Sequence, residues 1–285
     1  MSSGSVNPFG HAGLAAVSDT RAPEWASIFC ALEQHQAKFL SLQASFRSPH
    51  YRWPSDPLHT WSRCWEYPFA WHHIDHALAR LGEGATPLVA DIGSGVTFFP
   101  FAISMRKAEV VCVDTDPICQ EEFSKAIPLL ATPLSTLSFR HATTARLPFH
   151  DGEVDIAYCI SVLEHANDQG QLLSELVRIL RPGGTLVLTV DIGLHNRGEL
   201  TVEGLDNLRA GLWRSFSPIV PERMTHPRDL LTPRTSPYGL ERESPWRRAR
   251  TTAKLLLRAL RDPATACWQF NNLTVAGFAC QKPAG

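Results

Sequence analysis

One stretch, residues 88–117, constrains the fold of this chain more than any other. It opens with the apolar run Leu88–Ile92, passes through a short glycine-containing loop into an apolar segment, and ends with a second apolar run, residues 109–113. Short β-branched runs separated by a helix are typical of a β-α-β unit with two parallel strands. The stretch therefore predicts an α/β fold built on a parallel sheet.

The loop between these two strands indicates what the sheet binds. It reads Asp91-x-Gly93-x-Gly95, and a second acid, Asp114, closes the next strand about 20 residues after the glycines. In an open parallel sheet, ligands bind outside the carboxyl ends of the strands, where glycines let backbone N–H groups approach them. A carboxylate placed like that of Asp114 suits the hydroxyls of a ribose. The pattern predicts a nucleotide-like ligand.

The same loop distinguishes two classes of such ligands. A dinucleotide-binding loop reads G-x-G-x-x-G, but Phe98 stands at the position of its third glycine. The carboxylate of Asp91 would repel a pyrophosphate and would attract an ammonium or sulfonium group. An NAD-dependent oxidoreductase is therefore disfavoured, and S-adenosylmethionine, which carries both cationic groups, fits better.

Together these residues resemble the first two motifs of class I S-adenosylmethionine-dependent methyltransferases. The resemblance continues in order through Leu147-Pro148-Phe149, the strand at 154–159, the segment 161–165 and Arg181-Pro182-Gly183-Gly184, and it covers residues 88–191. It implies a Rossmann-like, seven-stranded, mostly parallel sheet with an antiparallel edge hairpin. Two positions depart from the family pattern, because Thr97 and Thr143 stand where a glycine and an acid are common.

The resemblance also implies where the cofactor S-adenosylmethionine binds. The first acid and both glycines would receive its methionine part, the second acid its ribose, three threonines its adenine, and a serine would lie near the sulfonium. In that order these residues are Asp91, Gly93, Gly95, Asp114, Thr115, Thr143, Thr144 and Ser161.

Candidate catalytic residues follow from the chemistry of methyl transfer. The reaction is an in-line displacement, so the protein must hold the acceptor atom close to the methyl carbon. An alcohol acceptor must also lose a proton, for which a histidine is a suitable base. His165 follows the fourth strand and His195 the fifth, so each is a candidate base, with structural or substrate-contacting roles as alternatives.

The predicted function is methyl transfer to a small molecule or glycan, at a hydroxyl oxygen. Transfer to carbon or nitrogen would use the same cofactor residues, and a protein that binds the cofactor without catalysis is a further alternative. The formal net charge of −1 and the absence of a basic sheet edge argue against a nucleic-acid acceptor. With no long apolar run and no secretory pattern, the sequence favours a cytoplasmic enzyme, and its seven cysteines are expected as free thiols.

The remaining sequence predicts two additions to the methyltransferase domain, which we place at residues 85–285. Residues 1–84 form a helical cap, with helices at about 23–46 and 68–81 and an aromatic-rich segment, 61–71, between them. That segment either packs on the sheet or shapes an acceptor pocket. An insertion at about 222–268 separates the two strands of the edge hairpin, 216–220 and 273–281.

Two further patterns leave alternatives open. Residues 246–261 predict a basic amphipathic helix, which either has a merely solvated positive face or contacts an anionic acceptor, an anionic membrane surface or a partner protein. A nucleotide-linked or lipid-linked sugar would suit such a helix. His72 and His76 share a helical face, as two zinc ligands do, but lack a distant third ligand, so no metal site is predicted.

Overall fold

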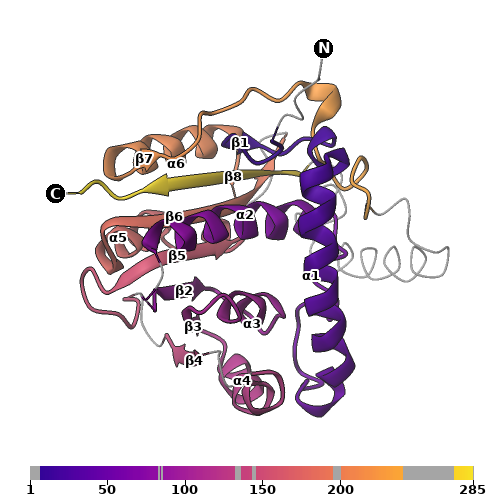
Figure 1. Ribbon diagram of the computed structural model, residues 1–285. Helices are drawn as coiled ribbons and strands as arrows, with labels where there is room; N and C mark the ends of the chain where they lie inside the picture. Colours follow the sequence, from indigo (N-terminus) through magenta and orange to yellow (C-terminus); the bar gives the residue numbers. More distant parts are fainter. Residues whose placement is uncertain are drawn as a thin grey trace.

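A computed structural model of the chain describes residues 7–82, 84, 86–131, 136–142, 146–194, 200–239 and 273–284. Within these residues, one mixed sheet has the strand order β1-β8-β6-β5-β2-β3-β4, with β7 also paired to β8 (Figure 1). The strands are β1 (Gly13–Leu14), β2 (Leu88–Ile92), β3 (Glu109–Asp114), β4 (Thr136–His141), β5 (Val154–Ile160), β6 (Leu180–Gly193), β7 (Ser217–Pro218) and β8 (Leu273–Gln281).

Helices cover both faces of this sheet. The α-helices are α1 (Pro23–Leu42), α2 (Arg63–Leu81), α3 (Phe99–Ser104), α4 (Pro117–Leu130), α5 (Gln169–Ile179) and α6 (Val202–Ser215). Short 3-10 turns are η1 (Ser18–Arg21), η2 (Gln43–Ser45), η3 (Leu163–His165) and η4 (Pro227–Asp229). Helices α5 and α6 pack on one face of β6, and α2 packs on the other face across β5, β6 and β8.

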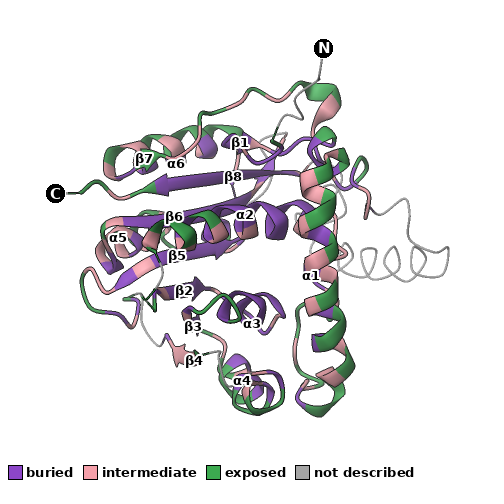
Figure 2. Cartoon of the chain, viewed as in Figure 1, coloured by how far each residue is buried: buried purple, intermediate pink, exposed green. Residues whose placement is uncertain are grey.

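The core has two layers because successive strand residues point to opposite faces. In β6, Val187 faces the layer that contains α2, whereas Leu186 and Leu188 face the layer that contains α5 and α6. The central strands are buried on both sides, as Figure 2 shows, which explains why they read as nearly continuous apolar runs.

The fold class predicted from the sequence is confirmed, with one difference in the edge of the sheet. Strands β2 to β6 are parallel and β8 is antiparallel to β6, as expected. The described residues form eight strands rather than seven, because the N-terminal strand β1 pairs with Gly277 and Ala276 of β8. The expected hairpin strand at 216–220 keeps only Ser217 and Pro218, since proline has no N–H to extend a ladder.

The start of α2 differs from the sequence prediction. The helix begins at Arg63 and includes the aromatic segment, with Pro68 in its interior. Proline at this position cannot donate to the carbonyl of Cys64, four residues earlier. That carbonyl instead accepts a hydrogen bond of 2.8 Å from the indole N–H of Trp25 in α1. A side chain from the neighbouring helix thus satisfies the group that a proline leaves open, which no local signal indicates.

The aromatic segment packs on the sheet, one of the two alternatives given by the sequence. Trp65 and Phe69 are fully buried and stack with ring centroids 4.7 Å apart. A Cβ atom at Gly277 of β8 would lie 2.7 Å from Trp65 and 2.8 Å from Phe69, so the glycine lets these rings lie directly on the strand. The segment therefore fixes α2 to the sheet.

The N-terminal segment also packs against the first part of the predicted insertion. Asp229 accepts hydrogen bonds from the backbone N–H and the hydroxyl of Ser18, at 3.0 and 2.5 Å. Arg223 pairs with the buried carboxylate of Asp19 at 3.0 Å. The predicted domain boundary at residue 84 stays a prediction, and the predicted basic helix, residues 246–261, lies outside the described residues.

Cys112 and Cys159 are buried in strands, and the described cysteines are free thiols, as expected.

Among the described helices, none combines the length and apolar character needed to cross a bilayer.

The Trp25–Cys64 hydrogen bond can be tested with a double-mutant cycle. Trp25→Phe keeps an aromatic ring stacked on Phe29 but leaves the carbonyl without its donor. We expect it to lower the free energy of unfolding, with about 1 kcal/mol due to the hydrogen bond. Adding Pro68→Ala supplies a backbone N–H for the same carbonyl, so the cost of Trp25→Phe should shrink by about that amount. Urea unfolding of the four proteins measures the coupling, and strictly additive effects would contradict it.

Candidate functional site

The glycine loop at the carboxyl end of β2 has the backbone conformation that its sequence requires. Gly93 and Gly95 have φ values of 71° and 50°, in the left-handed region that favours glycine. A Cβ atom at Gly93 would also lie 2.5 Å from the side chain of Val162, which follows β5. The loop therefore lies directly against the segment after β5. The lack of a side chain at Gly93 allows this close contact, and both glycines allow the left-handed backbone.

Asp114 closes β3 beside this loop. One carboxylate oxygen accepts the N–H of Gly95 at 2.8 Å, and the other accepts the N–H of Asp116 at 2.9 Å. A carboxylate has about four lone-pair positions, so each oxygen keeps capacity for a further donor. Asp116 in turn caps α4 by accepting the N–H of Ile118. The two backbone bonds fix the orientation of the Asp114 carboxylate and leave it able to accept further hydrogen bonds.

Asp91, the acid before the glycines, is buried at the end of β2. Burial raises the pKa of its carboxyl group to about 8, and the nearby charge of Asp114 adds to the rise. The Tyr158 hydroxyl and the positive charge of Arg63 act in the opposite direction. The carboxyl group is thus largely protonated at neutral pH, and a cationic group beside it would favour the ionised form.

A segment from the N-terminal cap holds the glycine loop from the other side. The Tyr51 hydroxyl accepts the N–H of Val96 at 2.8 Å, and Arg47 donates to the carbonyl of Val96 at 3.0 Å. The Arg47 guanidinium also lies over the Tyr51 ring at 3.8 Å and pairs with the buried carboxylate of Glu122 at 2.5 Å. The sequence analysis did not single out these residues, because they lie at and after the end of the first predicted helix, where no motif of the cofactor site was expected.

The carboxyl end of β5 carries Ser161, which was predicted to lie near the sulfonium. Its φ of 47° is left-handed, which is uncommon for a serine and marks a sharp turn out of the strand. The hydroxyl donates to Glu66 of α2 at 2.6 Å, and Thr189 of β6 donates to the same oxygen at 2.6 Å. Arg63 pairs with the other oxygen of Glu66 at 2.5 Å. The only signal of this arrangement in the sequence is the presence of two charged residues, Arg63 and Glu66, in an aromatic run.

Burial and pairing act on Glu66 in opposite directions. Burial alone would raise the pKa of its carboxyl group, but the Arg63 charge and the two hydroxyl donors together hold the pKa below its ordinary value. Glu66 is therefore a buried carboxylate that accepts hydrogen bonds from the end of β5, from β6 and from its own helix α2.

Two more acids stand at this edge. Glu164, in η3, is buried and accepts the backbone N–H of Asp191 in β6 at 2.8 Å. Burial raises the pKa of Glu164 well above its ordinary value, and the charge of Asp191 adds to the rise. The predicted base His165 follows directly but is exposed. The two residues thus differ in burial although they are neighbours in the chain.

The structure brings some predicted site residues together and leaves others aside. Asp91, Gly93, Gly95 and Asp114 share one edge with Ser161, whose neighbour Val162 contacts the glycine loop. Thr115 is exposed next to Asp114, and its carbonyl is 3.0 Å from a ring nitrogen of His141. The predicted residues Thr143, Thr144 and His195 lie outside the described residues.

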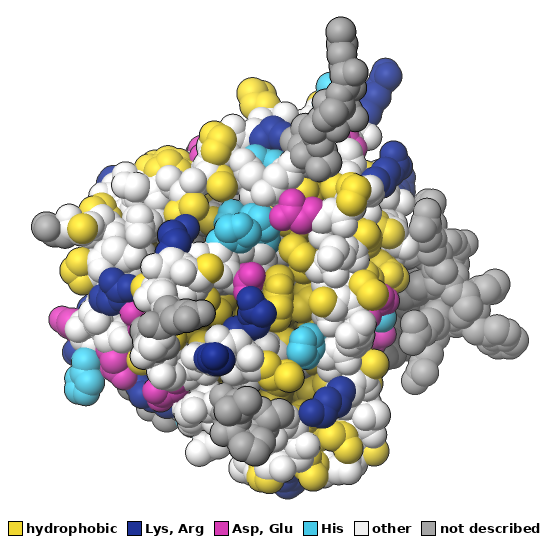
Figure 3. Space-filling view, viewed as in Figure 1, with side chains coloured by type: hydrophobic (Ala, Val, Ile, Leu, Met, Phe, Trp, Pro, Cys, Tyr) yellow, Lys and Arg dark blue, Asp and Glu magenta, His cyan; other side chains and the backbone are white. Residues whose placement is uncertain are grey.

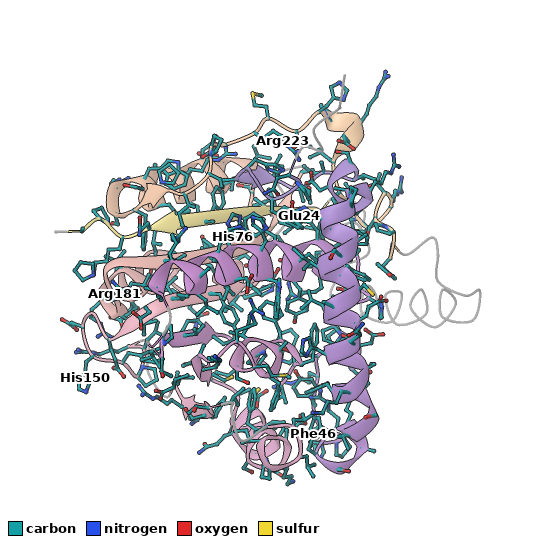
Figure 4. All side chains as sticks on the ribbon, viewed as in Figure 1. Glu24, Phe46, His76, His150, Arg181 and Arg223 are labelled. Atoms are coloured by element: carbon teal, nitrogen blue, oxygen red, sulfur yellow. The ribbon has the colours of Figure 1, made fainter. Side chains whose placement is uncertain are left out.

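The histidine pair of α2 has partners other than a metal. The rings of His72 and His76 lie 4.2 Å apart, and His72 contacts the Glu24 carboxylate of α1 at 2.9 Å. Figure 3 shows histidine side chains beside an acidic one on this face, and Figure 4 places Glu24 and His76 on the two helices. Within the described residues, no group of three or more potential ligands could hold a metal ion.

Comparisons with known proteins match the central part of this chain to methyltransferases. Residues 90–188 match the family described as "Methyltransferase domain". The chain is 36% identical over 108 residues to an uncharacterized methyltransferase of Mycobacterium sp. (strain JLS), covering 37% of this chain and 39% of that protein. It is 34% identical over 115 residues to the uncharacterized methyltransferase MLBr02584 of Mycobacterium leprae (strain Br4923), covering 39% and 41%. The chain thus spans less than half the length of these relatives.

A solved structure supports the fold. The crystal structure of the [4+2]-cyclase SpnF is similar with a TM-score of 0.52 at 17% identity, over 90% of this chain and 95% of that chain. The family match over residues 90–188, together with this fold, supports a class I S-adenosylmethionine-dependent methyltransferase domain in the central part of the chain, for which S-adenosylmethionine is the expected cofactor. The residues fit this cofactor, since Asp114 has free acceptor capacity for a ribose and Asp91 is a buried acid suited to an ammonium group.

The raised pKa of Asp91 predicts a pH dependence of cofactor binding. If Asp91 must be ionised to pair with the ammonium group, binding below pH 8 releases a proton. The Kd for S-adenosylhomocysteine should therefore fall as the pH rises from about 6 to 8, by up to about tenfold per unit, and then level off. Calorimetry in buffers of different ionisation enthalpy measures the proton released.

Asp91→Asn provides the control, because the amide cannot ionise. We expect weaker binding with a flat profile over the same range. A native profile that is flat, or that persists in Asp91→Asn, would contradict the assignment.

Proposed function

We propose that this chain transfers the methyl group of S-adenosylmethionine to a hydroxyl oxygen of a small-molecule or glycan acceptor. The observation that supports the proposal is that two groups of side chains, one suited to the methyl donor and one suited to an acceptor, lie at the same edge of the sheet. The ends of β2 and β3 carry the loop and acids suited to the methyl donor, and the end of β5 carries polar and ionisable side chains within reach of the same loop.

The protein's part in this reaction is mainly to bind and to orient. When bound, the cofactor supplies a methyl group already activated on a sulfonium. Asp114 would fix the ribose, and Asp91 the amino group of the methionine part. The turn at Ser161 would then define where an acceptor can stand in line with the S–CH₃ bond. A hydroxyl acceptor further needs a base, for which the ionisable groups after β5 are the candidates.

The acceptor itself is proposed only by its chemical class. Ionisable groups at this edge are mostly acids, namely Asp91, Asp114, Glu66, Glu164 and Asp191, and Arg63 is paired with one of them. This favours a neutral or cationic reacting group. An anionic substituent, as in a nucleotide-linked or lipid-linked sugar, would have to be bound elsewhere, for example by the predicted basic helix at residues 246–261. Transfer to nitrogen or carbon is the alternative outcome.

The cofactor half of the proposal is tested by calorimetric titration with S-adenosylmethionine and S-adenosylhomocysteine. Asp114→Ala removes the acceptor for the ribose and the two backbone bonds that position the loop. We expect it to raise both Kd values about tenfold or more, a loss of about 1.4 kcal/mol. Asp206→Ala, which changes an exposed acid on α6, is the matched control and should leave both Kd values unchanged.

The transfer half is tested with a methyl-labelled donor. A pool of hydroxyl, amine and carbon-acid acceptors is incubated with the native protein, and the labelled product is analysed for the atom methylated. Label on oxygen supports the proposal, whereas label only on nitrogen or carbon overturns the choice of oxygen. Tight cofactor binding without turnover on any acceptor would favour a non-catalytic binding protein.

A further inference from the structure

One buried carboxyl group at the β5–β6 edge is only half satisfied. Glu164 is 3% exposed, and its Oε1 accepts the N–H of Asp191 at 2.8 Å. Its Oε2 is also buried, yet no hydrogen-bond donor reaches it within the described part of the chain. Leaving a buried polar atom unpaired costs about 1–3 kcal/mol, so such atoms in native proteins call for a ligand, a water or a catalytic role.

The neighbouring Glu66 shows how this edge can pair both oxygens of a buried carboxylate within the protein. Both of its oxygens are occupied, by Ser161 and Thr189 on one side and by Arg63 on the other. Glu164 lies in the same region, since the charge of Glu66 acts on it, but among the described residues it has no cationic partner of this kind. The difference points to a partner for Glu164 that the described part of the chain does not supply.

The position of Glu164 indicates which partner this is. It follows the left-handed turn at Ser161 by three residues, and Val162 within that turn contacts the glycine loop. Arg63 interacts electrostatically with the ends of two strands, because its charge acts on Asp91 of β2 and also on Asp191 of β6. Glu164 therefore lies at the same edge of the sheet as the glycine loop and the end of β6.

We propose that Oε2 of Glu164 faces the methyl position and binds the acceptor hydroxyl directly, and that Glu164, not His165, is the base of the reaction. This inference rests on the function proposed above and makes it specific. The acceptor class that it implies is a hydroxyl on an uncharged part of the acceptor, because the Asp191 carboxylate beside Glu164 would repel an anionic group.

The chemistry balances without a further reactant. The acceptor oxygen forms a bond to the methyl carbon while the S–CH₃ bond breaks, and its electron pair stays on sulfur. The hydroxyl proton passes to the ionised carboxylate of Glu164. Burial and the Asp191 charge make this carboxylate more basic than an ordinary glutamate, which suits a proton acceptor. A positive charge at the methyl position favours its ionised form before the reaction.

The test uses two cofactor analogues, so that no acceptor needs to be known. Sinefungin carries an amino-bearing carbon in place of the methylated sulfonium, whereas S-adenosylhomocysteine carries neither a methyl group nor a charge there. If Oε2 faces the methyl position, the native protein should bind sinefungin about tenfold or more tightly than S-adenosylhomocysteine at neutral pH. In Glu164→Gln this preference should fall to about threefold or less, with the Kd for S-adenosylhomocysteine unchanged.

Two controls accompany the titration. Glu121→Gln makes the same change at an exposed glutamate of α4 and should keep the native preference. His165→Gln tests the rival base and should also keep it. The glutamine at position 164 can still accept the Asp191 N–H, and the S-adenosylhomocysteine titration reports directly whether the variant is folded.

The outcomes separate this inference from the proposed function. A native protein that binds neither analogue overturns the proposed function. Binding of both analogues with equal affinity by the native protein, or an unchanged preference in Glu164→Gln, overturns the role of Glu164 while leaving the proposed function intact. If His165→Gln loses the preference for sinefungin and Glu164→Gln keeps it, His165 and not Glu164 faces the methyl position.

Discussion

The structure of the candidate site depends on one buried ion pair and its hydrogen bonds. The Glu66 carboxylate, on the helix that covers the sheet, is bound by Arg63 and by hydroxyls from β5 and β6. Removing a carboxylate from water costs several kcal/mol, so such a group is stable only when its oxygens are fully paired. Because the donors come from separate elements, the pairing fixes α2 and both strand ends in one arrangement.

That constraint explains why the N-terminal cap cannot be regarded as a separate cover. Its aromatic residues lie directly on β8 at Gly277, and its Tyr51 and Arg47 hold the backbone of Val96 in the cofactor loop. The candidate cofactor site therefore includes contacts from the N-terminal segment as well as from the sheet. A change in the cap would be expected to reach the site through these hydrogen bonds rather than through the sheet.

The fold by itself does not choose the reaction. The similar structure of SpnF is that of a [4+2]-cyclase, so the same architecture serves a different chemistry in that protein. For this chain the distinguishing features are side chains: the acids of β2 and β3, and the unequal environments of Glu66 and Glu164. Both oxygens of the Glu66 carboxylate are paired, whereas only one oxygen of Glu164 is. This difference is a physical reason to assign the two groups different roles.

The fold class and the conformation of the glycine loop could be predicted from the sequence. Both depend on local patterns: apolar periodicity predicts strands and helices, and a left-handed loop beside a buried strand requires glycine at positions 93 and 95. The start of α2, the edge strand β1 and the partners of Glu66 and Glu164 became clear only from the three-dimensional structure. Each of these depends on contacts between residues far apart in the chain, such as Trp25 with Cys64 or Glu66 with Thr189, which no local pattern encodes.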